Sequence, residues 1–166
     1  MYGAHDDGTP VAEQLNDVEI ENISERNGQM LRNDLIDLMY GKGRPQSPDY
    51  HLNVALRSYE EGIGLLPNAT TSLTELNLYA DYSLKDINGK EVVKATAHAT
   101  ATYNQLQAAY GAYAADENAY QSCITEISRQ IVNRVSLYFS EGTTIKPPAQ
   151  EPAPAPIPGI TPGISR

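Results

Sequence analysis

A chain of 166 residues, 40% of them hydrophobic, is long enough for one domain with a buried core. Its formal net charge of -9 argues against general nucleic-acid binding, because Lys and Arg must neutralise phosphates to supply that affinity. The single cysteine, Cys123, excludes an internal disulfide and a cysteine-rich zinc site. These counts favour a folded acidic domain with no nucleic-acid partner.

The composition changes at both ends of the chain. Residues 1–14 are polar and include two glycines and a proline, which is typical of a flexible lead-in. Residues 143–166 hold most of the prolines and predict a disordered tail, because proline fits neither helix interiors nor sheet ladders. Residues 15–142 should form the one folded domain. No apolar run approaches the roughly 20 residues that span a bilayer, and no signal peptide is visible.

The domain should begin with a short strand and a helix. Asp17–Asn22 alternates apolar with acidic residues, as a strand does. Ser24 is placed to cap the following helix, and Glu25 suits the positive end of its dipole. Gly41 and Gly43 should end that helix. Its apolar stripe has helical spacing: Leu31, Leu35, Leu38 and Met39.

A second strand should follow the helix. Tyr50, Leu52, Val54 and Leu56 alternate with polar or small residues. The segment from Glu60 to Gly64 contains two glycines and could continue this strand through a bulge or bend.

Two long strands are predicted between Ser72 and Tyr103. They flank Asp86–Lys90, where Asn88-Gly89 is typical of a hairpin turn. One face of each strand is apolar and the other is polar, so one face should be buried and the other wet. The second of these strands places four alanines on its apolar face, and small side chains let a helix approach closely.

The partner of that alanine face should be a long last helix, from about Asp116 to Phe139. The element order is then β-α-β-β-β-α. A strand, helix and strand favour a parallel crossover, and the hairpins that follow are antiparallel. The sequence thus predicts an α+β two-layer sandwich, with two helices packed on one face of a four-stranded mixed sheet.

The polar face of this sheet and the ends of the central hairpin hold the candidate binding residues. Arg57, Lys85, Lys90 and Lys94 could form a small cationic patch for an anionic head group. The alternative is that these cations only solubilise the sheet and guard its edges. Three residues of the same face could contact a partner protein: Tyr79, Thr96 and His98.

The sequence does not indicate an enzyme, a cofactor or a metal site. His51 and His98 could approach each other if their strands are neighbours, but spacing supplies no third ligand. Glu60 and Glu61 are adjacent on a strand and point to opposite faces, so they would not share a substrate. None of the nucleophile-elbow, zinc-protease or phosphate-loop motifs occurs.

Several segments resemble the alphaproteobacterial LptE-type family of lipopolysaccharide (LPS)-assembly lipoproteins. The most specific is Arg26–Leu35, which begins Arg-Asn-Gly-Gln. Together with four further blocks, the resemblance covers roughly residues 17–140. These blocks are Asp17–Ile23, Asp49–Leu56, Ala95–Tyr110 with its Thr-Tyr-Asn step, and Val135–Phe139.

The resemblance implies a fold of two helices on a four-stranded sheet and a function without catalysis. Members are lipid-anchored outer-membrane proteins that face the periplasm, plug the LptD β-barrel and assist LPS insertion. The acylated cysteine of the family is missing, and Met1 resembles the position just after it, so the anchor is implied for the native protein only. The family does not fix which basic residues bind LPS. The alternative is another envelope lipoprotein, such as an auxiliary subunit of a lipid ABC transporter.

Overall fold

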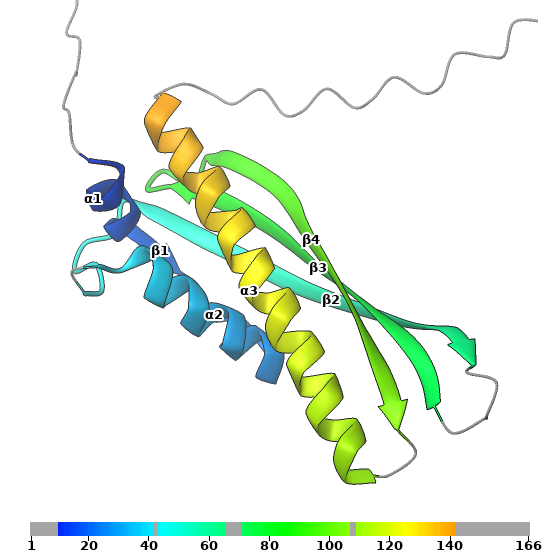
Figure 1. The fold of residues 1–166 in the computed structure, drawn as a ribbon. Helices are drawn as coiled ribbons and strands as arrows, with labels where there is room; N and C mark the ends of the chain where they lie inside the picture. Colours follow the sequence, from blue (N-terminus) through cyan, green and yellow to red (C-terminus); the bar gives the residue numbers. More distant parts are fainter. Residues whose placement is uncertain (1–9, 42, 66–70, 107–108, 142–166) are drawn as a thin grey trace, which may run out of the picture.

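The computed structural model describes residues 10–41, 43–65, 71–106 and 109–141. Two helices lie on one side of a long twisted sheet, and a short third helix lies near its first strand (Figure 1). The elements in chain order are α1 (Val11–Asn16), β1 (Val18–Ile20), α2 (Arg26–Met39), β2 (Tyr50–Leu65), β3 (Thr71–Asp86), β4 (Glu91–Leu106) and α3 (Ala109–Glu141).

The sheet has four strands in the order β1-β2-β3-β4. β1 pairs with β2 in parallel, and Val18 lies opposite Tyr50. The β2–β3 and β3–β4 pairs are antiparallel and run almost the full length of their strands. This arrangement confirms the predicted α+β fold with a mixed sheet and its helices on one face.

The expected irregularities of the long strands are present. The register of β2 against β3 shifts between Gly62 and Gly64, so this segment continues the strand through a bulge. At the β3–β4 turn, Oδ1 of Asp86 accepts hydrogen bonds from the N–H groups of Asn88 and Lys90, both at 2.9 Å. Gly89 has φ +80°, a backbone conformation that glycine adopts without strain.

The core lies between the sheet and the helices. α3 contributes an apolar stripe that includes Cys123 and Ile127, both buried, and this stripe faces β3 and β4. The small Ala97 and Ala99 of β4 are buried beneath it, as the alanine pattern predicts. Cys123 is only 1% exposed, and burial raises its thiol pKa, so it is a core residue.

Three element boundaries differ from expectation. α1 takes in residues 11–14, which we expected in the lead-in, and Leu15 anchors this helix in the core. α2 begins at Arg26 after Glu25, whose φ of 71° breaks the helix, so Ser24 is not the N-cap. α3 begins at Ala109 rather than near Asp116. The rest of the lead-in and the proline-rich tail lie outside the described residues.

Candidate functional site

The open face of the sheet, on the side away from the helices, carries most of the residues that the sequence singles out. The strand register aligns Arg57 of β2 with Tyr79 of β3 and His98 of β4. A neighbouring row aligns Asp81 with Thr96. Residues two apart on a strand share a face, so both rows lie on this side. The structure thus brings together Arg57, Tyr79, Thr96 and His98.

An ion pair organises one half of this group. Arg57 donates from Nε to Oδ2 of Asp81 at 2.8 Å and from Nη2 to Oδ1 at 3.2 Å. Oγ1 of Thr96 donates to the same Oδ1 at 2.6 Å. The hydrogen bonds from Arg57 and Thr96 lower the pKa of Asp81, and Asp81 in turn raises the pKa of Arg57. Asp81 is therefore an ionised acceptor at the centre of the group.

Stacked rings organise the other half. The rings of Tyr79 and His98 are parallel to within 13°, with centroids 4.3 Å apart. The guanidinium carbon of Arg57 lies 5.4 Å from the centre of the Tyr79 ring, within cation–π range. Oδ1 of Asn77 lies 3.1 Å from Nε2 of His98 and accepts a hydrogen bond from Thr100 at 3.0 Å. We call the whole set the open-face cluster: Arg57, Asn77, Tyr79, Asp81, Thr96, His98 and Thr100.

Lys94 lies at a shallow hollow beside this cluster. Its Nζ is 3.6 Å from Oε1 of Glu91. The hollow has a volume of about 330 Å³, and its lining includes Asn53, Asp81, Ser83, Glu91, Lys94 and Thr96. It therefore combines one lysine with two carboxylates, so its charge is not strongly positive.

Lys85 and Lys90 lie at the hairpin end of the sheet. Lys85 is six residues from Tyr79 along β3, a separation of about 20 Å at the rise of a strand. Lys90 belongs to the β3–β4 turn. Neither lysine forms an ion pair with another described residue. The structure therefore separates these two cations from Arg57 and leaves them accessible at one end of the sheet.

The two strand histidines do not meet, because β3 lies between β2 and β4. Nδ1 of His51 is instead 3.2 Å from Oε2 of Glu19 on β1. Within the described ranges, no three His, Cys, Asp or Glu side chains are grouped as metal ligands. Across the same residues, no helix is both long and apolar enough to cross a membrane.

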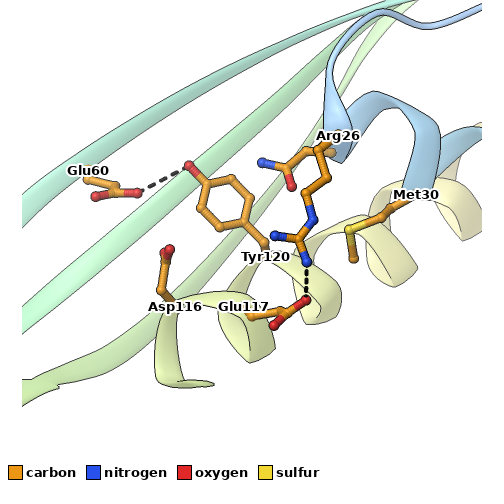
Figure 2. A pocket seen from close by; sticks show the side chains of 7 residues that line it. Arg26, Met30, Glu60, Asp116, Glu117 and Tyr120 are labelled. Carbon is orange, nitrogen blue, oxygen red and sulfur yellow. Dashed lines mark hydrogen bonds and ion pairs between the residues drawn. The ribbon is translucent and has the colours of Figure 1, made fainter. Parts of the chain in front are cut away.

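A second cavity lies on the helix side of the sheet, at the edge of β2 (Figure 2). We call it the β2-edge pocket. Its volume is about 320 Å³. It is lined from α2 by Arg26, Asn27 and Met30, from β2 by Glu60, and from α3 by Asp116, Glu117 and Tyr120.

The β2-edge pocket has an acidic lining. The Tyr120 hydroxyl donates to Oε1 of Glu60 at 3.1 Å, and Nη2 of Arg26 donates to Oε1 of Glu117 at 2.6 Å. Burial, followed by the negative charges of Glu60 and Glu117, raises the pKa of Asp116. Three carboxyl groups therefore share the pocket with one arginine, which already faces one of them.

Sequence reasoning missed this pocket. It placed Glu60 where the second strand could continue, without a partner from either helix, and the structure brings α2 and α3 to it. The pocket residues come from three elements, and the only sequence signal was the local excess of acidic residues near Glu60 and Asp116. Nothing in a single sequence pairs positions more than fifty residues apart, so the pocket depends on tertiary structure.

The fold and its open face define a class of protein: a two-layer α+β domain with one polar sheet surface free of helices. The chain belongs to the lipopolysaccharide-assembly family LptE, which matches residues 15–135. Membership places it among the envelope lipoproteins that take part in LPS assembly. No curated protein sequence matches the chain significantly.

Solved structures share the fold. A lipoprotein from Caulobacter crescentus CB15 is 27% identical, with a TM-score of 0.64 over 80% of this chain and 97% of its own. A minor lipoprotein from Acinetobacter baumannii is 15% identical, with a TM-score of 0.59 over 74% and 91%. Lipoprotein B from Nitrosomonas europaea is 18% identical, with a TM-score of 0.55 over 76% and 89%. The last two support the fold alone.

Proposed function

We propose that this protein is a non-catalytic outer-membrane lipoprotein that assists LPS transport and assembly at the cell surface. Family membership supports the LPS role. Similarity to the C. crescentus lipoprotein supports a lipid anchor on the native protein, which would hold the domain on the periplasmic side of the membrane. Its direct partner in this proposal is an LptD-like β-barrel that the domain plugs.

The observation that carries the plug assignment is the open face of the sheet. Three strands of 16 residues make a slab about 50 Å long. The open-face cluster presents charged and hydrogen-bonding groups already fixed by their neighbours. The lumen of a large outer-membrane barrel is polar, so a rigid polar face can bind it without burying apolar surface.

LPS binding is the second part of the proposal. The basic candidates are Arg57, Lys85, Lys90 and Lys94, which could bind lipid phosphates through charge-assisted hydrogen bonds. Arg57 is already engaged by Asp81, and Lys94 by Glu91. Lys85 and Lys90 keep their charge available at the hairpin end, so we assign the phosphate contact to them first. The barrel would then contact the Tyr79, Thr96 and His98 region.

Co-purification of the native anchored protein tests the plug assignment. The expected result is a stable complex with an LptD-like barrel, together with binding of the domain to LPS micelles. The LPS signal should fall in Lys85→Gln and in Lys90→Gln, each tested singly, whereas the matched single change Lys94→Gln should affect it less. Absence of both the barrel complex and LPS binding would remove the proposal.

Photocrosslinking in cells locates the contact surface. A photoreactive residue at position 57, 79 or 94 should crosslink to the barrel, because these positions lie on the open face. Position 137 on α3 is an exposed control on the helix side. Crosslinks to an inner-membrane transporter instead would support the alternative, an auxiliary subunit of a lipid ABC transporter.

A further inference from the structure

Much of the outer edge of β2 has no neighbouring strand. β1 covers only Tyr50–Leu52, although β2 continues to Leu65. Figure 1 shows β2 extending well past the end of β1. In the part of the chain that the structure describes, no other strand lies on that side. Positions 57–64 are all exposed, on both faces of the strand.

The backbone groups on this edge can be identified from the register. The Leu52 carbonyl accepts a hydrogen bond from Glu21 N–H at 3.0 Å, so Leu52 points its backbone groups outward. Backbone direction alternates along a strand, so the outward row continues through Ser58, Glu60 and Gly62. These are the donors and acceptors that an added strand would use.

At the opposite edge of the sheet, a side chain bonds outward backbone groups of β4. On β4, the Gln130 side chain of α3 donates to the His98 carbonyl at 3.0 Å and accepts from its N–H at 3.3 Å. This side-chain amide occupies backbone groups that an incoming strand would need. Gln130 therefore covers one outward position of β4, whereas no described side chain covers the outward backbone groups of the Ser58–Gly62 row.

The β2-edge pocket lies beside this row and indicates what the partner carries. Glu60 belongs to both, and Asp116 and Glu117 face it from α3 (Figure 2). Oδ1 of Asp116 is buried and has no hydrogen-bond partner among the described residues. A Lys or Arg side chain entering the pocket would pair with these carboxylates.

We propose that the exposed edge of β2 binds an extended segment of a partner protein as a fifth strand, with a Lys or Arg side chain of that segment in the β2-edge pocket. This is strand addition, in which backbone hydrogen bonds supply affinity and a side-chain pocket supplies specificity. A second copy of the chain fits less well, because two β2 edges would bring together two sets of Glu60 and Glu61. The assignment does not rest on LPS binding or on the barrel.

Synthetic peptides test the proposal on the folded chain. The probes are labelled eight-residue peptides of alternating Val and Thr with one central Lys, and their binding is measured by fluorescence anisotropy. We expect saturable binding. Replacing the Lys with Glu should weaken binding at least about tenfold, because the loss of a charge-assisted hydrogen bond lowers affinity by that factor or more. Absence of binding up to about 1 mM peptide would overturn the proposal.

Backbone methylation of the peptide tests strand addition without changing the protein. Two complementary peptides carry N-methyl groups on alternate amides, so that one blocks the amides facing β2 and the other blocks those facing solvent. The peptide with methylated β2-facing amides should not bind, whereas the peptide with methylated solvent-facing amides should bind. Equal binding of the two peptides would exclude an added strand.

Variants of the protein locate the site. Ser58→Pro removes an outward N–H on β2 and should abolish binding, because proline is tolerated on an edge but blocks pairing there. Thr102→Pro makes the matched change on the β4 edge and should leave binding intact. Glu60→Gln and Asp116→Asn should each weaken the Lys peptide at least about fivefold, whereas Glu91→Gln should not. Binding that survives Ser58→Pro would overturn the proposal.

Analytical sedimentation tests whether a second copy of the chain occupies the β2 edge. A monomer is expected, with or without the Ser58→Pro change. A dimer that dissociates in Ser58→Pro but persists in Thr102→Pro would assign the β2 edge to a second copy of the chain. That result would overturn the proposal of a partner segment with a Lys or Arg side chain.

Discussion

Gly28 and Gln29 give the Arg-Asn-Gly-Gln segment its structural role. A Cβ on Gly28 would lie 2.6 Å from Cγ2 of Ile23 and 3.2 Å from its backbone carbon. Nε2 of Gln29 donates to the Ile23 carbonyl at 2.6 Å and to Oδ1 of Asn22 at 2.9 Å. The segment therefore packs the loop between β1 and α2 against the first turn of the helix.

Gly28→Ala should destabilise the domain by about 1–3 kcal/mol, because a methyl group must displace buried Ile23 and nearby backbone. Urea unfolding followed by circular dichroism measures the change. Gly41→Ala is the matched control, since a Cβ there meets nothing within 4 Å. Equal stability of the two variants would show that the loop adjusts without cost.

Asp81 gives the open face a dependence on pH. Its pKa is lowered in the folded state, chiefly by Arg57 and then by Thr96. A lowered pKa contributes stability that is present above the ordinary pKa of about 4 and is lost as pH falls through the folded value. The stability difference between the wild type and Asp81→Asn should therefore shrink below pH 4. Urea unfolding between about pH 2 and 7 measures it, and a difference that stays constant would contradict the assignment.

Within the β4 element, Gln130 of α3 covers the outward backbone groups of His98. Gln130→Ala removes both contacts with His98 and should cost about 1 kcal/mol, the net contribution of a typical hydrogen bond. The His98 amide should also exchange faster with solvent, which NMR measures directly. Gln121→Ala changes an exposed glutamine on the same helix and serves as control. If His98 exchange is unchanged in Gln130→Ala, that amide is protected by something else.

The sequence predicted elements where periodicity was strong and failed where backbone conformation decided. The alternation around the Asn88-Gly89 turn identified the paired strands, and the alanine pattern identified the helix that covers them. Ser24 was chosen as N-cap from residue type alone, whereas the helix start depends on the positive φ of Glu25. The six-residue α1 has too short an apolar pattern to show a period, and tertiary packing of Leu15 supports it.

The same limits apply to the candidate site. Alternation assigned four residues to one face, because successive residues of a strand point to opposite faces of the sheet: Arg57, Tyr79, Thr96 and His98. Their grouping required the register, which a sequence does not state. The ion partner of Arg57, Asp81, was missed for that reason.

Across the whole molecule, one buried tyrosine, Tyr82, and several partly buried ones pack between the sheet and the helices. Burial raises the pKa of at least five described tyrosines: Tyr40, Tyr82, Tyr103, Tyr120 and Tyr138. For Tyr103 the value is about 12, through burial and then the negative charge of Glu60. These tyrosines come from both layers, so their ionisation should weaken the packing between the helices and the sheet.

The domain should therefore lose stability at alkaline pH. A phenol whose folded pKa exceeds its unfolded value of about 10 contributes stability that is complete below pH 10 and is lost as pH rises through the folded value. Stability from urea unfolding should fall steeply between about pH 10 and 12, and Tyr103→Phe should make that fall shallower. Tyr59→Phe, at a residue 60% exposed, should leave the slope unchanged. If Tyr103→Phe follows the wild-type curve over this range, Tyr103 does not couple ionisation to folding.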